Sequence, residues 1–443
     1  MKLRILRDPE MVKAPILESP GFAKKGLSDF HLDLARRCAA GCSYCSSNIG
    51  YPMRVNKQRL VALAREQLGE EVDPTRAPDV SIVWDADEVM RRLKAQVMSK
   101  KGPGWGQGKT LMVSQLTDAF LGYPLSSGLT RRALDRVLLS TSFRVRILTK
   151  SDVVGREPWL SYFKAHPGRF VVGLSVGTLD DAWAAKVEPG TSKPSARLRA
   201  LRRLQDAGVP TFGMLCPIFP DASSDEALGK LLDAIRPEQC ETVWAEPFND
   251  RDNWQAVREG YAVDGDEWTW FTDVYGRRNM KAWSAYATSI YATLWCRAVR
   301  DGWLHKLAYL LYEDQITAGD AWTFRNLEGV LLQSKPIAKE TRGAIPIPNA
   351  DAGYSPNPWI RKLQTSPAHG RVEPPMDGQC CKAAMKAEEE SAARDGRGVS
   401  TAPCIRHMRT VHPKQWKAAL AAEDPKGPVS LPSPIDVPAG CAE

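Results

Sequence analysis

Short apolar segments alternate with helical segments through the middle of the chain, and this alternation limits the folds that are open to it. The expected strands are 30–34, 109–115, 143–149, 170–176, 211–216 and 242–246, and the helices that separate the later strands are 130–140, 156–166, 195–207 and 224–236. Strands that alternate with helices usually pair in parallel. We therefore predict an α/β fold, a partial (β/α)6 barrel of the TIM type, with its site at the carboxyl ends of the strands.

The regions that flank this barrel have a different character. Residues 1–29 are basic and are interrupted by three prolines, which predicts an N-terminal arm or covering loop. Residues 30–280 form the expected barrel region, including helices at 57–70 and 86–100 and a short apolar run of uncertain role at 81–84. Residues 281–443 are expected to form a C-terminal extension that is helical over 281–312 and then irregular, because proline and glycine are frequent after residue 335.

Composition narrows the class of protein. The 443 residues are 43% hydrophobic and 25% charged, with no apolar run of the roughly 20 residues that span a bilayer. The charged N-terminus lacks the apolar core of a signal peptide, so we expect a cytoplasmic protein whose ten cysteines stay reduced. The net charge of +8 and the 14 tryptophans are compatible with a nucleic-acid partner.

Three cysteines follow the first expected strand at a Cys-x3-Cys-x2-Cys spacing. They are Cys38, Cys42 and Cys45, and the aromatic residue Tyr44 precedes the third. Three thiolates on one tight loop can bind three irons of a [4Fe–4S] cube and leave the fourth iron open to a cofactor. The alternatives are buried free thiols or a zinc knuckle, which usually needs four ligands and would have to recruit His31 from the preceding strand.

This loop resembles the cluster motif of the radical S-adenosylmethionine (SAM) superfamily. The resemblance implies that the open iron binds the amino and carboxylate groups of SAM and that reductive cleavage of SAM gives a 5'-deoxyadenosyl radical. It also implies a reducing partner of the flavodoxin or ferredoxin type. It makes Tyr44, next to the third cysteine, a candidate cofactor-binding residue as well.

Short motifs after the later strands resemble one branch of that superfamily, the spore-photoproduct-lyase-like proteins. The series comprises Thr117–Phe120, Thr149–Ser151, Thr178–Asp180, Glu188–Gly190, Arg197, Ala207–Gly208 and Pro217–Pro220. The match covers about residues 30–250, and its specificity lies in the order of the motifs, since each is short.

The resemblance implies a SAM site that the chemistry of the side chains also supports. Thr117 and Asp118 would lie near the amino group of SAM. Lys150 and Arg197 are cations suited to its carboxylate and hydroxyls, and Ser175 would reach the ribose. A single Lys or Arg is more commonly a surface charge, so the expectation depends on the series as a whole.

Cys216 ends the fifth expected strand and is the candidate catalytic residue. It could donate or relay a hydrogen atom, and the alternative is a small buried hydrophobic residue. In the lyase the hydrogen-donor cysteine comes soon after the cluster. This chain has no cysteine between Cys45 and Cys216, which favours modification or rearrangement of a base over repair of a lesion.

Two further patterns carry weaker signals. The first is a group of possible ligands for a second metal, in which adjacent cysteines are poor partners on one ion; its members are Cys380, Cys381, Cys404, His407 and His412. The second is Gly108-Lys109-Thr110, which resembles the end of a phosphate loop. Pro103 stands where that motif requires its first glycine, and a strand pattern follows where a helix is needed, so we predict a turn before a strand.

Together these features predict a radical SAM enzyme that abstracts hydrogen from a nucleobase in DNA, either thymine or a modified thymine. The product would be a hypermodified, rearranged or repaired base, and a duplex base would have to leave the stack at a cost of a few kcal/mol. One alternative is a radical SAM enzyme that acts on a small molecule or peptide. The other is a non-enzymatic zinc- or nucleic-acid-binding protein.

Overall fold

A computed structural model describes residues 3–333 of the chain, apart from short gaps. The gaps are 11–13, 50, 100–103, 251–252, 313–314, 318–319, 321–323 and 325–326. The cysteine and histidine group between Cys380 and His412 therefore lies outside the described residues, as does the expected irregular segment after residue 335. The chain divides into two units, Met1–Tyr275 and Gly276–Glu443.

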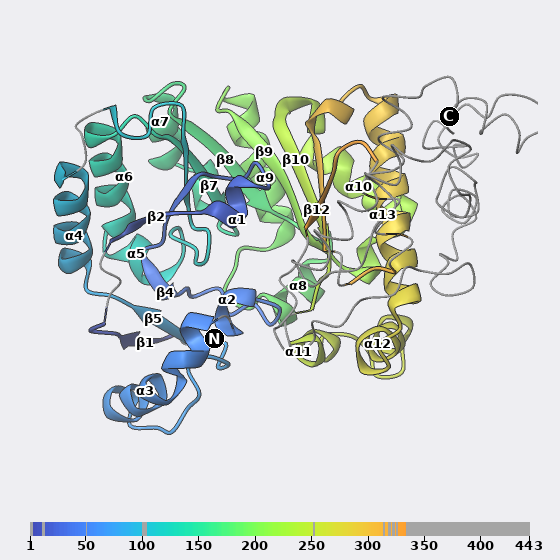
Figure 1. The fold of residues 1–443 in the computed structure, drawn as a ribbon, viewed down its shortest axis with the longest axis horizontal. Coiled ribbons are helices and arrows are strands. Elements are labelled where there is room, and N and C mark those ends of the chain that lie inside the picture. Colours follow the sequence, from blue (N-terminus) through green and yellow to red (C-terminus); the bar gives the residue numbers. More distant parts are fainter. Residues whose placement is uncertain are drawn as a thin grey trace, which may run out of the picture. The chain divides into compact units, whose positions relative to one another are not determined.

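A parallel sheet forms the centre of the first unit (Figure 1). Its strands stand in the order β10 (Cys240–Pro247), β9 (Thr211–Ile218), β8 (Phe170–Ser175), β7 (Arg144–Thr149), β6 (Thr110–Val113) and β3 (Phe30–Leu32). Neighbours in this order pair in parallel, and β2 (Ile16–Glu18) pairs with β3 in the antiparallel sense. Within the part of this unit that the structure describes, no pairing joins β2 to β10, so the sheet stays open. The prediction of an α/β partial barrel with six parallel strands is confirmed.

Helices follow the strands of this sheet and close the β/α units. They are α5 (Gly122–Ser126), α6 (Leu129–Ser140), α7 (Trp159–Lys164), α8 (Asp181–Val187), α9 (Pro194–Asp206) and α10 (Asp225–Ile235), with 3-10 turns at Asp152–Gly155, Pro220–Ala222 and Pro237–Gln239. In α9, Leu198, Leu201 and Leu204 recur at helical spacing and are buried against the sheet. Gly208 ends that helix with a φ of +74°, which glycine adopts without strain.

A second, three-stranded sheet belongs to the same unit and lies below the first in the view of Figure 1. Its order is β1 (Arg4–Arg7), β5 (Val80–Val83) and β4 (Ala35–Arg37). The long helix α3 (Tyr51–Leu68), which follows α2 (Ser46–Ile49), packs on β1 through a core that includes Leu6 and Leu60. The remaining helices of this region are α1 (Pro20–Ala23) and α4 (Ala86–Ser99).

This small sheet corrects two expectations. The N-terminal arm or covering loop expected over residues 1–29 instead contributes β1 to one sheet and β2 to the other. The apolar run at 81–84, for which no role was predicted, belongs largely to β5. The cysteine loop follows β4 and not the end of β3, because the chain leaves the parallel sheet after Leu32 and pairs with β5 before it reaches Cys38. Strands of three or four residues are too short to show a period in the sequence.

After β10 the first unit ends in α11 (Trp254–Arg258), α12 (Asp266–Phe271) and a π-helical turn at Thr272–Gly276. In the second unit, α13 (Met280–Arg300) precedes a 3-10 turn (Leu304–Lys306) and two parallel strands, β11 (Leu307–Tyr312) and β12 (Val330–Gln333). The helix expected over 281–312 therefore ends at Arg300. Residues 307–312 form a fully buried strand, and periodicity cannot separate such a run from a buried helix. None of the helices in the described residues has the length and apolar character needed to cross a membrane.

Candidate active site

The cysteine loop is fixed by backbone contacts on both of its sides. The amide of Ser43 donates to the carbonyl of Val187 at 2.9 Å, and the amide of Gly190 donates to the carbonyl of Ala40 at 2.9 Å. A Cβ atom on Gly190 would stand 2.0 Å from the carbonyl oxygen of Ala39, so this close approach requires glycine. The loop is thereby held against the turn between α8 and α9.

Two thiols of the loop have raised pKa values. Burial, followed by the neighbouring Cys45, raises the pKa of Cys38 to about 12, and burial, Glu188 and the other two thiols raise that of Cys42 well above its usual value. Iron binds the thiolate, so loading a cluster would release these protons. Among the described residues, no three His, Cys, Asp or Glu side chains are close enough to hold a single metal ion.

The donor set fits an iron cube with one open iron. Three thiols come from one loop, and a cube of four irons holds its ligands farther apart than a single ion does. His31, the fourth ligand that a zinc knuckle would need, has its Nδ1 2.6 Å from Ser19 Oγ and its Nε2 3.9 Å from Asp33 Oδ2. In the described part of the chain, Cys38, Cys42 and Cys45 are therefore the residues that could hold the cluster.

Glu188 is the centre of a buried polar group beside this loop. Its carboxylate, which is 5% exposed, accepts hydrogen bonds from the Tyr44 hydroxyl and the Arg197 guanidinium. The ammonium group of Lys150 lies 3.8 Å from it and 5.6 Å from the centre of the Tyr44 ring. Burial raises the pKa of Glu188, but Arg197 and Lys150 more than offset this and the net shift is downward. Glu188 lies within a predicted motif, yet it was not among the predicted site residues.

Three predicted residues form a chain of contacts across the carboxyl ends of neighbouring strands. Lys150 Nζ donates to Ser175 Oγ at 2.6 Å, and Ser175 Oγ donates to the carbonyl oxygen of Cys216 at 2.7 Å. The thiol of Cys216 in turn donates to Glu246 Oε2 at 3.3 Å. Burial and the adjacent Glu246 raise the pKa of Cys216 well above its usual value, so this thiol stays protonated.

Asp118 fixes the backbone next to the Lys150 side of this chain of contacts. Its buried carboxyl group accepts hydrogen bonds from Thr149 Oγ1 at 2.9 Å, from the Lys150 amide at 2.8 Å and from the Phe120 amide at 2.9 Å. Burial raises the pKa of Asp118 despite these donors. These contacts fix the backbone at Lys150, so in this structure Asp118 acts on the site through Lys150.

Thr117 is held by a carboxylate that sequence analysis did not single out. Asp33, which follows β3, accepts from the amide and the hydroxyl of Thr117 at 2.9 and 3.0 Å and from the Leu116 amide at 2.9 Å. The turn it organises begins at Ser114, whose φ of 76° is rare for a residue with a side chain. A single aspartate after a strand gave no signal in the sequence that would have identified this role.

Arg197 lies deeper than the expected ligand contact. Its side chain is 1% exposed, and its guanidinium donates to Glu188 and, at 2.6 Å, to the carbonyl oxygen of Ser175. The structure therefore places Arg197 behind Glu188 and β8, where it can orient both. A side chain that is buried in this way can orient its neighbours but does not reach a cofactor directly.

An aromatic cluster borders the site on the side of β9 and β10. The Tyr44 and Phe219 rings are 5.4 Å apart, Phe219 and Phe248 are 5.8 Å apart, and Phe248 contacts Phe271 and Tyr275. The cluster also contains Trp183, Val187 and Val257, with Trp254, Tyr261 and Trp270 packed against it. It joins the cysteine loop to helices α11 and α12.

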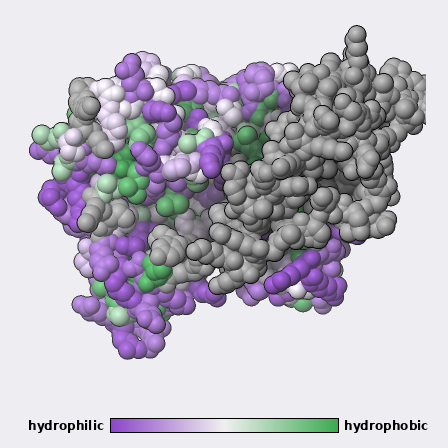
Figure 2. All heavy atoms as spheres, in the orientation of Figure 1, coloured by the Kyte–Doolittle hydropathy of each residue, from purple (hydrophilic) through white to green (hydrophobic). Residues whose placement is uncertain are grey.

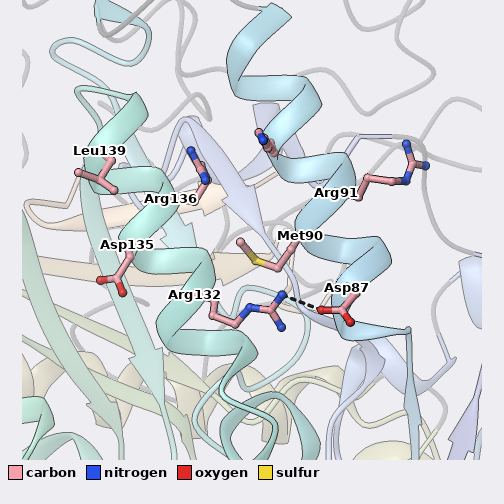
Figure 3. A pocket seen from close by; sticks show the side chains of 8 residues that line it. Asp87, Met90, Arg91, Arg132, Asp135, Arg136 and Leu139 are labelled. Atoms are coloured by element: carbon pink, nitrogen blue, oxygen red, sulfur yellow. Dashed lines mark hydrogen bonds and ion pairs between the residues drawn. The ribbon is translucent and has the colours of Figure 1, made fainter.

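A hollow of about 470 Å³ lies elsewhere in the unit, between α4 and α6 (Figure 3). It is lined by Asp87, Met90, Arg91, Lys94, Arg132, Asp135, Arg136 and Leu139, and Arg132 forms an ion pair of 2.7 Å with Asp87. The hollow contains no predicted site residue.

On the face shown in Figure 2, hydrophilic side chains cover most of the surface of the described residues.

Comparisons of the chain with known proteins find similarity at low sequence identity. No family model matches the chain. It is 22% identical over 284 residues to the uncharacterized protein ORF301 of the Acidianus two-tailed virus. This match covers 61% of this chain and 86% of that protein. Among solved structures it is similar to spore photoproduct lyase complexed with dinucleoside spore photoproduct, at 16% identity and a TM-score of 0.38, over 58% of this chain and 66% of that one.

A second similar structure is Streptococcus suis SuiB bound to the precursor peptide SuiA. The identity is 11% and the TM-score 0.32, over 56% of this chain and 46% of that one. The chain thus matches just under two thirds of the length of spore photoproduct lyase and less than half of SuiB. Spore photoproduct lyase, whose branch the sequence resembles, is among the structures to which this chain is similar.

Proposed function

We propose that this protein is a radical SAM enzyme. The observation that carries the proposal is the position of the cysteine loop. Hydrogen bonds from Ser43 to Val187 and from Gly190 to Ala40 hold the three thiols against the turn that carries Glu188. Glu188 lies 3.8 Å from Lys150, so the loop adjoins the polar groups at the carboxyl ends of β7 and β8. Ligands of sheets with parallel strands bind at this end.

In this proposal each polar group has a stated task. Cys38, Cys42 and Cys45 would hold a [4Fe–4S] cluster, which together with SAM and one electron from a reduced donor supplies a 5'-deoxyadenosyl radical. Lys150 would bind the carboxylate or a hydroxyl of SAM, and Ser175 would bind its ribose. Thr117 and Asp118 would lie on the side of its amino group. Tyr44, Glu188 and Arg197 would set the position of the Lys150 ammonium group.

We propose DNA as the substrate, with hydrogen taken from thymine or a modified thymine. The net charge of +8 favours a polyanion, and the ordered motifs resemble the lyase-like branch. An extruded base could stack on the half-buried ring of Tyr44 in the cysteine loop, which packs on the buried Phe219. The product would be a rearranged, hypermodified or repaired base.

One observation favours a second candidate, a small molecule or a peptide. The described residues 253–276, which follow β10 and adjoin the aromatic cluster, contain Arg258 as their only basic residue. The same stretch contains five acidic residues, namely Glu259, Asp264, Asp266, Glu267 and Asp273. This excess of negative charge would repel a phosphate backbone on that side of the site.

Two measurements test the proposal. Anaerobic reconstitution with iron and sulfide should give about four irons per protein and the absorption of a [4Fe–4S] cluster. A Cys42→Ala variant should lose both, and Cys240→Ala, which removes a buried thiol in β10, should keep them. Stoichiometric zinc in place of iron would overturn the cluster assignment. For the substrate, binding of DNA by the protein that weakens steeply as the salt concentration rises supports a polyanionic substrate. Absence of DNA binding supports the second candidate.

A further inference from the structure

Two adjacent arginines precede the first cysteine of the loop, and strand β4 sends them to opposite faces. Arg36 extends to the Asp8 carboxylate and donates to the carbonyl oxygen of Glu10 at 2.7 Å. Arg37 extends the other way and is 3% exposed. Side chains alternate along a strand, so one of these two neighbouring arginines lies at the periphery and the other is buried.

The buried guanidinium of Arg37 lies against the segment on which the cysteine loop rests. It donates hydrogen bonds to the carbonyl oxygens of Ala77 and Val80. Pro78, between these two residues, has its carbonyl oxygen 2.3 Å from the position that a Cβ atom on Gly41 would take. The same short segment therefore contacts both the Arg37 guanidinium and the middle of the cysteine loop.

Further contacts hold Arg37 in this place. Ser81 Oγ donates to the carbonyl oxygen of Arg37 at 2.9 Å, and β4 pairs with β5 on that side. Arg37 also directly precedes Cys38, and the segment that its guanidinium contacts is in contact with Gly41 of the loop. The guanidinium is therefore held beside the cysteine loop, and it keeps its charge at neutral pH because arginine is so strongly basic.

We propose that Arg37 is a positioning residue that tunes the reduction potential of the cluster held by this loop. The inference rests on the proposed function, since it needs the cluster. An electron that enters a thiolate-bound cluster adds negative charge, and a fixed cation in a poorly solvated place stabilises the reduced form more than the oxidised one. Net charge and hydrogen bonding around a cluster are among the factors that set its potential. Arg37 therefore makes the cluster easier to reduce.

The test compares three variants by reductive titration of the reconstituted protein, followed by electron paramagnetic resonance. Arg37→Gln removes the charge, Arg37→Lys keeps it, and Arg36→Gln removes the neighbouring charge on the other face as a matched control. We expect a midpoint potential that is more negative for Arg37→Gln than for the wild type. The Arg37→Lys and Arg36→Gln variants should titrate close to the wild type. Iron content and circular dichroism establish that the variants compared are folded and loaded.

Each outcome decides the proposal. An Arg37→Gln protein that carries a full cluster at the wild-type potential would overturn it. If Arg37→Gln fails to fold, Arg37→His decides, because an imidazole loses its charge as the pH rises: a midpoint potential that becomes more negative than that of the wild type with rising pH supports the role of the charge, and the same potential as the wild type at every pH refutes it. A wild-type protein that takes up no cluster would instead contradict the proposed function, so the two failures are distinguishable.

Discussion

The ammonium group of Lys150 donates a hydrogen bond of 2.6 Å to the hydroxyl of Ser175 on the neighbouring strand. The two residues stand at the carboxyl ends of β7 and β8, where the sequence series predicted that both would contact SAM. The Lys150 side chain is 16% exposed and lies 3.8 Å from the buried Glu188. The pair therefore combines a fixed cation with a hydroxyl group in a partly enclosed place, which suits a ligand that has a carboxylate and ribose hydroxyls.

Removing the Lys150 ammonium group should weaken SAM binding. A charge-assisted hydrogen bond contributes about 1.5–3 kcal/mol, which corresponds to roughly a 10- to 100-fold rise in Kd. Lys150→Met should show this loss in isothermal titration of the anaerobic, cluster-loaded protein with SAM. Lys230→Met, which removes an exposed lysine of α10, should leave the Kd unchanged. Equal SAM affinities for Lys150→Met and the wild type would exclude Lys150 from the SAM site.

Enlarging Gly190 should separate the cysteine loop from its support. A methyl group there would stand 2.0 Å from the Ala39 carbonyl oxygen, and a clash with backbone cannot be relieved by a rotamer change. We expect Gly190→Ala to lose about 1–3 kcal/mol of unfolding free energy and to bind less iron on reconstitution. Gly21→Ala, at a position with open space around it, is the control for denaturant unfolding. Wild-type iron content in Gly190→Ala would show that the loop does not need this contact.

The ion pairs of Asp8 should make stability depend on acid pH. Burial raises the pKa of Asp8, but hydrogen bonds and charge from Arg59, Arg36 and the Glu10 amide more than offset this, so the folded pKa lies below the usual 3.8. The stabilisation is thus fully present above that value and is lost as the pH falls through the folded pKa. Asp8→Asn should lower the unfolding free energy by about 3 kcal/mol at pH 7, because two cations lose their partner.

This prediction is checked by urea unfolding between pH 3 and pH 7. The difference between wild type and Asp8→Asn should shrink as the pH falls below about 4. Glu226→Gln, in an exposed pair with Lys230, should be indistinguishable from the wild type at each pH. A difference that stays constant with pH would mean that the charge of Asp8 is not what stabilises the small sheet.

Cys216 provides a test of hydrogen return. If its thiol gives a hydrogen atom to a substrate radical, the S–H bond breaks, a C–H bond forms, and the sulfur radical left behind takes a hydrogen atom from 5'-deoxyadenosine or an electron and a proton from the donor. In D₂O the exchangeable thiol should then place deuterium in the product. Cys216→Ala should still cleave SAM but form at least tenfold less product, and Cys240→Ala should behave as the wild type. If Cys216→Ala forms unlabelled product at the wild-type rate, then Cys216 does not donate hydrogen and contributes only to packing.

Much of the parallel sheet could be predicted from the sequence. The run at 170–176 became β8 (Phe170–Ser175), and the run at 143–149 became β7 (Arg144–Thr149), because buried parallel strands are apolar throughout and are bounded by turns. The helix expected at 195–207 is α9 (Pro194–Asp206), whose leucines recur at helical spacing. The turn expected before 109–115 is also present, and it leads directly into β6.

The parts that could not be predicted depend on long-range contacts. Strands β1, β4 and β5 are short and acquire their structure only by pairing with one another, so the support of the cysteine loop had no local signal. Arg197 has the composition of a ligand-binding cation, but its burial behind Glu188 follows from packing that one sequence does not reveal. Asp33 and Glu188 were missed as site residues for the same reason.

Formation of 5'-deoxyadenosine by the reconstituted, reduced protein, under anaerobic conditions with SAM, tests whether this chain is a radical SAM enzyme. We predict that the wild type forms 5'-deoxyadenosine and that Cys42→Ala forms none. If DNA is the substrate, deuterium should pass into 5'-deoxyadenosine from deuterated thymine DNA that is unirradiated, irradiated or substituted. Formation that is independent of DNA would keep the radical SAM assignment and favour a small molecule or peptide. Absence of 5'-deoxyadenosine together with absence of SAM binding, in protein that carries its full cluster, would contradict the account.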